Sequence, residues 1–370
     1  MRSFIYNQMR TNGSKINETA YMQIYRHIKK DIVDSIYPYG TKIPSKRTIS
    51  SQFGVSVITA EHAYALLCDE GYIRSVEKSG YFVDFRPDDG FSSFPEEFAT
   101  NTTTPQAYYD SFEAYRFPPS VLAKTMRSVI TNRENDILQK SPNNGIEEFR
   151  EAISRYLARN KDIRVTPDRI VVGSGAEYLY NLIAGLIGRG RIVALEDPSY
   201  DKIRRVYEVS NITCDLLPLG NDGIESSALN KTKADVLHIS PFRSFPTGIT
   251  SSASKRHEYI RWADKRGGLI IEDDYESEFS VLGKPVETLF SMTENDNVIY
   301  LNTFSKSISP ALRVGYMVLP EHLMNKFNEQ LGFYSCTVPT FEQLVLSELL
   351  SSGSFERHIN RVRRKMRAGL

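Results

Sequence analysis

One lysine in this sequence stands among residues that together could perform covalent chemistry. Lys306 follows the apolar run 298–301, and Arg313 comes seven residues after it. Asp273 and Tyr275 follow another apolar run upstream. A lysine amine forms a Schiff base with an aldehyde, a carboxylate keeps a pyridine nitrogen protonated, and an arginine attracts a phosphate dianion. Pyridoxal phosphate (PLP) needs these groups, so the sequence predicts a PLP site with Lys306 as its catalytic lysine.

A glycine-containing turn upstream is suited to bind the phosphate of this cofactor. The apolar run 170–172 leads into Ser174, Gly175 and Ala176, and a helical pattern continues to Leu186. The backbone N–H groups and the positive end of a helix attract anions at its first turn. Each part has a commoner explanation when taken alone, because many lysines are solvated and many glycine turns only start a helix. The order of all the parts along the chain favours a PLP site.

Composition narrows the class of protein. The 370 residues suggest two or three domains, and contents of 41% hydrophobic and 25% charged residues are typical of globular proteins. No apolar run approaches the ~18 residues of a membrane helix, and the polar tail 1–17 does not resemble a signal peptide. The three cysteines and six histidines show no disulfide or metal-ligand spacing. We therefore expect a cytoplasmic protein without a bound metal.

The pattern of residues 18–85 is typical of a winged helix-turn-helix. The sequence predicts three helices followed by two strands, over 19–35, 46–53, 56–70, 72–76 and 81–85. Ser45 and Ser56 are the expected N-caps of the second and third helices, and Gly54 makes the turn between them. This order of elements indicates a DNA-binding domain. Residues 1–85 contain 11 Lys and Arg against 8 Asp and Glu, a balance that suits such a role.

The remainder of the chain predicts a linker and an α/β domain. Residues 86–112 are rich in Pro, Gly, Ser and Thr and show little periodicity, which indicates a linker. From 113 to 370, strands alternate with helices, so we expect a mostly parallel sheet with ligands at its strand ends. The predicted strands are 169–173, 191–195, 236–240, 269–271, 298–301 and 314–319.

The winged-helix region resembles the GntR-type DNA-binding domain. The motifs that carry the resemblance are 42–47, 53–56 and 70–73. The resemblance implies DNA contacts from Ser45, Lys46, Arg47, Ser56, Thr59, Lys78, Ser79 and Gly80. Many relatives carry an arginine where this chain has Val57, so their base preference does not transfer; a valine could meet a thymine methyl group instead. The alternative is a helical hairpin that contacts protein, with its lysines merely solvated.

The whole chain from residue 20 onward resembles the MocR/GabR regulators, in which a GntR-type domain is fused to a fold-type I aminotransferase-like domain. The motifs are 245–248, 272–279, 304–307 and 313–316. The resemblance implies that Lys306 forms the internal aldimine, Asp273 pairs with the pyridine nitrogen and Tyr275 donates to the ring hydroxyl. Implied phosphate ligands are Ser174, Gly175, Ala176, Ser305 and Arg313, and the implied stacking partner is Tyr200. Such sites are usually built at a dimer interface, so a homodimer is expected.

Two features depart from the family pattern. Arg243 and Ser244 stand where relatives usually have a His-Gln pair. In the family, the helix near residue 370 leads into a small C-terminal domain that usually carries the arginine for a substrate carboxylate. We therefore expect the domain 113–370 to be C-terminally incomplete, either as a fragment or as a natural truncation.

These features predict a PLP-dependent transcription regulator that binds operator DNA. It would sense an amino compound, or PLP itself, through an aldimine at Lys306, and its transaminase activity would be absent or slow. The alternative is a working PLP-dependent aminotransferase with an appended DNA-binding domain. A third possibility, a DNA-binding regulator that has lost PLP, is disfavoured by the intact Asp273, Tyr275 and Arg313.

Overall fold

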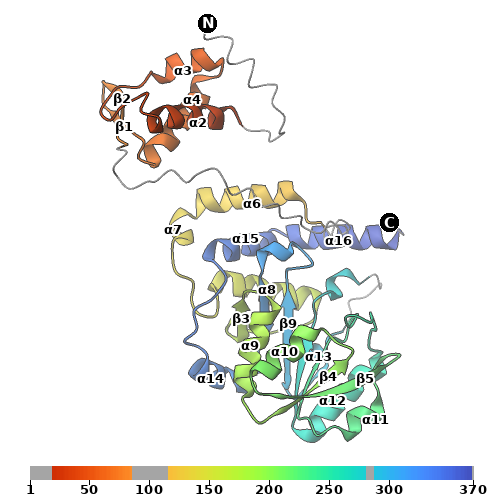
Figure 1. The fold of residues 1–370 in the computed structure, drawn as a ribbon. Helices are drawn as coiled ribbons and strands as arrows, with labels where there is room; N and C mark the ends of the chain where they lie inside the picture. Colours follow the sequence, from red (N-terminus) through yellow and green to blue (C-terminus); the bar gives the residue numbers. More distant parts are fainter. Residues whose placement is uncertain (1–18, 86–115, 281–286, 369–370) are drawn as a thin grey trace. The chain divides into compact units, whose positions relative to one another are not determined.

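The computed structural model describes residues 19–85, 116–280 and 287–368. The chain divides into two separate units, and the boundary between them lies between Thr103 and Thr104 (Figure 1). The predicted tail 1–17 and the predicted linker 86–112 lie outside the described residues. None of the described helices is long and apolar enough to span a membrane.

The smaller unit is a winged helix. Its elements are α2 (Ala20–Val33), α3 (Lys46–Phe53), α4 (Val57–Asp69), β1 (Ile73–Val76) and β2 (Gly80–Val83). The Ser45 hydroxyl accepts a hydrogen bond from the backbone N–H of Thr48 at 3.2 Å, and Ser56 caps α4 in the same way. Gly54 takes a left-handed conformation between the two helices, which glycine adopts without strain. The predicted elements are present, with ends shifted by at most two residues.

The larger unit is built on an eight-stranded sheet. Its strands are β3 (Ile170–Gly173), β4 (Ile192–Asp197), β5 (Thr213–Gly220), β6 (Gly223–Ile224), β7 (Val236–Ile239), β8 (Leu269–Asp273), β9 (Val298–Thr303) and β10 (Gly315–Val318). They lie in the order β3-β10-β9-β8-β7-β4-β5-β6. The five strands from β9 to β5 in this order are parallel, whereas β10 is antiparallel to both of its neighbours. The mostly parallel sheet predicted from the sequence is therefore confirmed.

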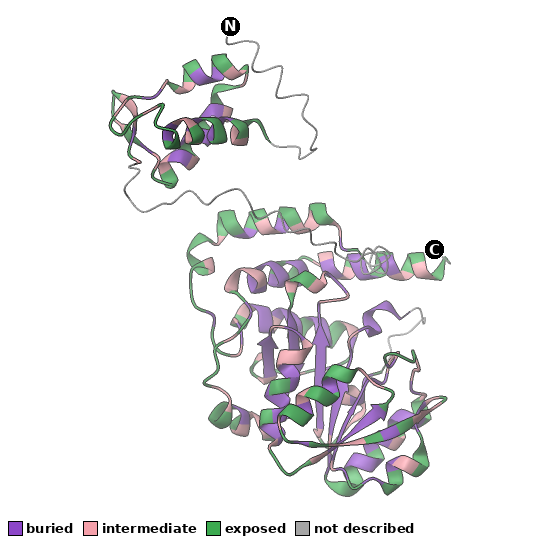
Figure 2. Cartoon of the chain, in the orientation of Figure 1, coloured by how far each residue is buried: buried purple, intermediate pink, exposed green. Residues whose placement is uncertain are grey.

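Helices cover both faces of this sheet because its strands are apolar on both sides. The helices are α6 (Pro119–Asn132), α7 (Glu134–Ile137), α8 (Glu147–Asn160), α9 (Ala176–Ile187), α10 (Asp201–Val209), α11 (Ser226–Lys231), α12 (Ala253–Arg266), α13 (Leu289–Met292), α14 (Glu321–Gln330), α15 (Thr340–Ser351) and α16 (Ser354–Arg367). Ile299 and Leu301 of β9 pack with α9, α10 and α14, whereas Tyr300 between them packs with α8, α15 and α16. Figure 2 shows the central strands of the sheet almost entirely buried, with exposed turns on the outer sides of the helices.

Candidate functional site

Strand ends bring the predicted PLP residues to one edge of the sheet. Gly315 at the start of β10 pairs with Gly173 at the end of β3 and with Thr303 at the end of β9. Asp273, at the end of β8, pairs with Leu301 of β9. Because β10 is antiparallel to both neighbours, its first residue lies beside their last residues. The segments after β3, β8 and β9 and the segment before β10 therefore meet at this edge.

A cavity of about 400 Å³ lies at this edge. The predicted residues that line it are Ala176, Tyr200, Asp273, Tyr275, Ser305, Lys306 and Arg313. Ser174 and Gly175 are not among its lining residues, and the Ser174 N–H donates to the hydroxyl of Thr337 at 3.1 Å. The lining also contains polar residues that the sequence reasoning missed: Glu177, Tyr180, Glu196 and His238.

Lys306 lies against a carboxylate at the side of this cavity. Its Nζ is 3.1 Å from Glu276 Oε2 and 5.1 Å from the centre of the Tyr275 ring. The other carboxylate oxygen, Glu276 Oε1, is 3.2 Å from Nη1 of Arg243. Glu276 is buried, whereas the Lys306 side chain is 37% exposed. One carboxylate thus bridges two cations, and the lysine amine remains accessible to a small molecule.

Asp273 is a buried acid whose surroundings fit a pyridine nitrogen. The Tyr180 hydroxyl donates a hydrogen bond to Asp273 Oδ2, and His238 Nε2 lies 4.0 Å from the same oxygen. Burial raises the pKa of Asp273 to about 7 and lowers the pKa of His238 to about 3, so this imidazole is neutral. Asp273 Oδ1 is buried and accepts no hydrogen bond from the residues that the structure describes. The protonated pyridine nitrogen of PLP would supply the donor that this oxygen lacks.

The turn at the start of α9 has the chemistry of an anion site. Gly175 has a φ of +95°, and a Cβ at this position would lie 2.9 Å from Nη2 of Arg313. Only glycine lets the backbone approach the guanidinium so closely. Glu177 Oε2 is 2.6 Å from Arg313 Nη2, and Glu177 Oε1 is 2.8 Å from Lys202 Nζ. Burial favours the neutral acid, but hydrogen bonds from Lys202 and Arg313 lower the pKa of Glu177 to about 2. The two cations suit a phosphate as well as they suit this carboxylate.

Two tyrosines predicted to contact the cofactor ring also have protein partners. The ring of Tyr200 packs edge to face against Phe245, with 5.9 Å between the ring centres. The Tyr275 hydroxyl donates to the backbone oxygen of Arg243 at 2.5 Å. Burial raises the pKa of Tyr275, so its hydroxyl stays protonated and remains a donor.

Arg243 and Ser244, which stand where relatives usually have a His-Gln pair, both contact carboxylates near the cavity. Arg243 pairs with Glu276, and the hydroxyl of Ser244 donates to Glu196 Oε2 at 2.6 Å. The N–H of Ser240 donates to the same oxygen at 3.2 Å. Burial raises the pKa of Glu196 to about 7. Glu196 could have been noticed in the sequence, because it is a second acid at the end of an apolar run.

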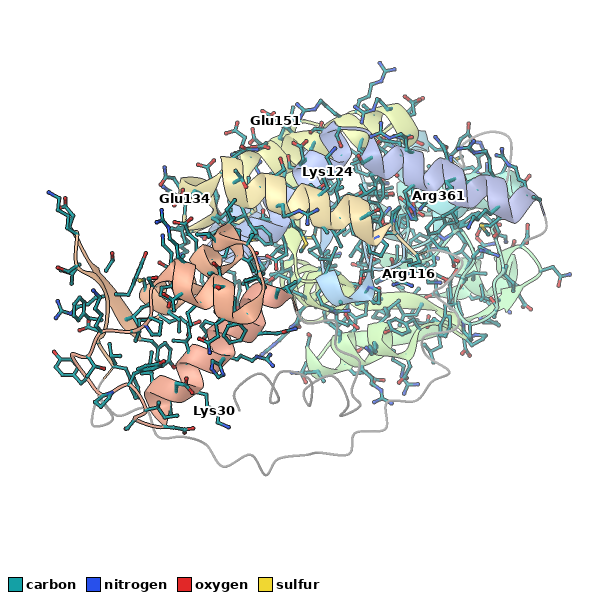
Figure 3. The ribbon with its side chains drawn as sticks, turned by 90° about the horizontal axis from the view of Figure 1, so that it is seen from above. Lys30, Arg116, Lys124, Glu134, Glu151 and Arg361 are labelled. Atoms are coloured by element: carbon teal, nitrogen blue, oxygen red, sulfur yellow. The ribbon has the colours of Figure 1, made fainter. Side chains whose placement is uncertain are left out.

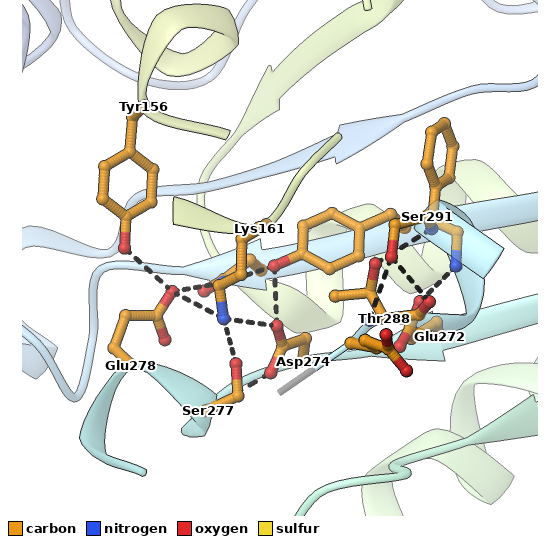
Figure 4. A network of polar contacts seen from close by, with 12 residues as sticks. Tyr156, Lys161, Glu272, Asp274, Ser277, Glu278, Thr288 and Ser291 are labelled. Carbon is orange, nitrogen blue, oxygen red and sulfur yellow. Dashed lines mark hydrogen bonds and ion pairs between the residues drawn. The ribbon is translucent and has the colours of Figure 1, made fainter. Parts of the chain in front are cut away.

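A buried ionic network lies on the face of β8 that points away from the cavity (Figure 4). Lys161 Nζ is 2.9 Å from Asp274 Oδ2 and 3.6 Å from Glu278 Oε1, and all three side chains are buried. The Tyr300 hydroxyl also donates to Asp274 Oδ2, at 2.7 Å. Because strand side chains alternate between faces, Asp273 points toward the cavity and Asp274 points toward Lys161. This network joins the end of α8 to the segment that carries Asp273.

A larger cavity, of about 610 Å³, lies elsewhere in the larger unit. It is lined by residues of α6, α15 and α16, among them Lys124 and Arg361, which lie on neighbouring helices (Figure 3). None of the predicted site residues is among the residues that line it. The cavity of about 400 Å³ is therefore the candidate site, because the predicted PLP residues line it.

The predicted DNA contacts occupy three parts of the winged helix. Ser45 and Ser56 are the caps described above, and Thr59 lies in the first turn of α4. Lys46 Nζ is 2.6 Å from Glu61 Oε1, whereas Arg47 is exposed. At the wing tip, Lys78 and Ser79 are exposed, and Lys78 and Gly80 have φ of +58° and +111°. The contacts of these residues with DNA stay predictions.

Comparisons with known proteins identify both units. Residues 20–83 match the bacterial regulatory proteins of the gntR family, and residues 108–369 match aminotransferase class I and II. The uncharacterized HTH-type transcriptional regulator YdeL of Bacillus subtilis is 30% identical over 94% of this chain and 76% of its own length. The probable rhizopine catabolism regulatory protein MocR of Rhizobium meliloti is 24% identical over 93% of this chain and 74% of its own length. The HTH-type pyridoxine biosynthesis transcriptional regulator PdxR of Corynebacterium glutamicum is 26% identical over 93% of this chain and 76% of its own length.

Solved aminotransferase structures share the fold of about two thirds of the chain. Pyrococcus horikoshii kynurenine aminotransferase, solved in complex with PMP, has a TM-score of 0.62 and 24% identity over 67% of this chain. An archaeal alanine:glyoxylate aminotransferase has a TM-score of 0.61 and 25% identity over 65% of this chain. The chain covers 64% and 62% of the lengths of these two proteins, which is less than two thirds. The predicted fold class and the predicted cofactor, PLP, are confirmed. The chain therefore belongs to the MocR/GabR-type regulators, in which a gntR-family winged helix precedes a domain of aminotransferase class I and II.

Proposed function

We propose that this PLP-dependent transcription regulator senses an amino compound, or PLP itself, at the cavity around Lys306 and thereby changes its affinity for operator DNA. The observation that carries the proposal is the meeting of Lys306, Asp273 and Arg313 in one cavity of about 400 Å³. PLP supplies an aldehyde that amines attack and a ring that withdraws electrons from the attached group.

Each residue around the cavity has a distinct role in this proposal. Lys306 provides the amine that holds the cofactor covalently, and its exposed side chain leaves room for a competing amine. Asp273 would accept a hydrogen bond at its Oδ1 and would keep the bound nitrogen protonated, because a neighbouring carboxylate favours the charged form of that nitrogen. Arg313, beside Gly175, attracts the phosphate and fixes the orientation of the ring.

Regulation requires that the effector bind two states of the protein with different affinities. We propose a homodimer, because two winged helices would then meet two half-sites of an operator. The site of action would be the cytoplasm, where a gntR-type bacterial regulator meets its DNA.

The second candidate function is that of an aminotransferase with an appended DNA-binding domain. The aminotransferase names of the solved relatives favour it. In that case Lys306 would move a proton at the α-carbon of the substrate over many cycles. Continuous release of keto acid from an amino acid would support this function, and a single turnover at most would contradict it.

The covalent role of Lys306 can be tested by titrating PLP into the full chain and recording the visible absorbance. We expect a new band in the wild type and in Lys265→Ala, a control variant at an exposed lysine of α12. We expect no such band in Lys306→Ala. Borohydride reduction followed by mass spectrometry should leave the cofactor mass on the peptide that contains Lys306. A wild-type chain that gains no band beyond the absorbance of free PLP, even at millimolar PLP, contradicts the proposal.

The regulatory role can be tested by gel shift with DNA from the protein's own promoter. PLP, or PLP with a panel of amino compounds, should change the dissociation constant of the wild type but not that of Lys306→Ala. If both proteins bind DNA equally in all conditions, the cavity has no part in regulation.

A further inference from the structure

The first turn of α4 carries two exposed apolar side chains. Val57 and Ile58 are the first two residues of the helix, directly after the cap Ser56, and they are 44% and 66% exposed. Exposing such side chains to water is unfavourable. Other apolar residues of the same helix, such as Ala60 and Tyr64, are instead buried in the core of the unit.

The remaining exposed residues of α4 are poorly suited to reading guanine or adenine. The helix 57–69 contains no Arg, Lys, Asn or Gln, the side chains that form paired hydrogen bonds with these bases. Its exposed Glu61 is held by Lys46 at 2.6 Å, and its His62 packs edge to face against Tyr21 with 6.0 Å between ring centres. The exposed side chains of its first turn, Val57 and Ile58, therefore present methyl groups.

Exposed cations lie on other elements of the winged helix. Arg47 on α3 and Lys42 before it are exposed, and so is Lys78 in the turn between β1 and β2. Lys42 also approaches the wing, since its Cε would lie 3.0 Å from a Cβ placed on Gly80. A domain that carries both exposed cations and exposed methyl groups complements a DNA groove, where phosphates lie at the edges and base edges lie inside.

We propose that Val57 and Ile58 read the 5-methyl groups of thymine in the major groove of the operator. A recognition helix directs its N-terminal residues at the base edges, and thymine is the only base with a methyl group in that groove. The thymine methyl group would contact the two side chains without any covalent step. The exposed lysines and arginine would bind phosphates and so supply the part of the affinity that does not depend on DNA sequence. This inference rests on the proposed binding of operator DNA and adds the base class that is recognised.

The test begins with selection of binding sites from a random duplex pool by the full chain at low salt. In a selected site, each thymine is then replaced by uracil, which removes only the methyl group. We expect at least one replacement to weaken wild-type binding about four-fold, the value expected for losing one buried methyl-sized group.

Two double variants with matched exposure complete the test. In Val57→Ala with Ile58→Ala, the thymine and uracil duplexes should bind equally. In Val33→Ala with Ile36→Ala, which alters residues that are 41% and 62% exposed outside α4, the four-fold penalty should remain. Circular dichroism checks that both variants keep their helices.

The outcomes separate this inference from the proposed function. Wild-type protein that selects a site but binds its uracil and thymine forms equally overturns the methyl readout and leaves DNA binding intact. A penalty that persists in the Val57/Ile58 variant also overturns it, because the methyl groups are then read elsewhere. Failure to select any duplex, even at low salt, overturns the proposed DNA binding and the methyl readout with it.

Discussion

Asp273 is the residue whose charge depends most clearly on what occupies the cavity. It is buried, its carboxylate accepts a hydrogen bond from the Tyr180 hydroxyl, and burial raises its pKa to about 7. When an acid has a higher pKa in the folded state than in the unfolded state, its contribution to stability is fully present below the unfolded pKa, which is near 3.9 for Asp. This contribution is lost as the pH rises through the pKa of the folded state. The cofactor-free protein should therefore lose stability between about pH 4 and pH 7.

We expect Asp273→Asn to remove part of this pH dependence. The difference in unfolding free energy between variant and wild type should shift in favour of the variant by on the order of 3 kcal/mol as pH rises from 4 to 7. Denaturant titrations monitored by the fluorescence of Trp262, the single tryptophan, measure it in the larger unit. Parallel stability curves for the two proteins would show that Asp273 is ionised at low pH despite its burial.

Glu276 should oppose the reaction of Lys306 with an aldehyde. Its carboxylate lies 3.1 Å from the lysine Nζ, and this ion pair must break before the amine can bond to carbon. Since partly exposed pairs contribute up to about 1 kcal/mol, Glu276→Gln should tighten PLP binding up to about five-fold in an absorbance titration. Glu208→Gln, which removes an exposed ion pair with Arg204 on α10, should leave the affinity unchanged. Weaker binding in Glu276→Gln would instead mean that Glu276 positions the lysine.

The sequence predicts the acid of the site but not its surroundings. Asp273 is recognisable because it follows an apolar run and precedes Tyr275. The partner of Asp274 is not recognisable, because Lys161 lies 113 residues away and its local sequence resembles an ordinary helix end. Only folding brings α8 beside β8, so pairs of this kind are visible in the structure alone.

At the scale of single elements, the start of α9 shows how backbone geometry creates a binding site. Gly175 at its N-terminus and Gly188 at its C-terminus have φ of +95° and +84° with ψ near 180°, a region that only glycine adopts readily. A Cβ at Gly175 would lie 2.9 Å from Arg313 Nη2, whereas a Cβ at Gly188 meets no atom within 4 Å among the described residues. The two positions share their strain and differ in their neighbours.

We therefore expect Gly175→Ala and Gly188→Ala to lower stability by similar amounts, about 1–3 kcal/mol. Only Gly175→Ala should weaken PLP binding, by about ten-fold or more, because the new methyl group displaces the guanidinium from the phosphate position. Thermal unfolding and absorbance titration measure the two effects separately. Equal loss of PLP affinity in both variants would mean that the strain and not the position of Arg313 matters.

Element prediction succeeded where the pattern of the sequence is strong. The strands that end at the cavity are continuous apolar runs, and the caps of α3 and α4 are serines that precede helical patterns. The sequence did not predict β5 and β6, so the list of expected strands was incomplete. Asp215 and Pro218 interrupt the apolar pattern of β5, and the whole strand lies near the edge of the sheet, where such residues are tolerated.

At the scale of the molecule, the two units have separate hydrophobic cores. The core of the winged helix contains described residues between Tyr21 and Phe85 only, whereas the three clusters of the larger unit contain residues from Phe117 onward. A ligand that binds one folded unit stabilises that unit through mass action. The second unit is stabilised as well only if it makes contacts with the first unit that are lost when the first unit unfolds.

PLP should therefore raise the unfolding midpoint of the larger unit alone. At a concentration of 100 times its dissociation constant, a ligand contributes about 2.7 kcal/mol, which corresponds to roughly 5–10 °C for a unit of this size. Trp262 fluorescence reports the midpoint of the larger unit, and hydrogen exchange of amides in α2 and α4 reports the winged helix. In the absence of DNA, exchange in α2 and α4 should not change with PLP. Equal protection of both units by PLP would show that they unfold together, and the effector signal would then act through the folding of the DNA-binding unit itself.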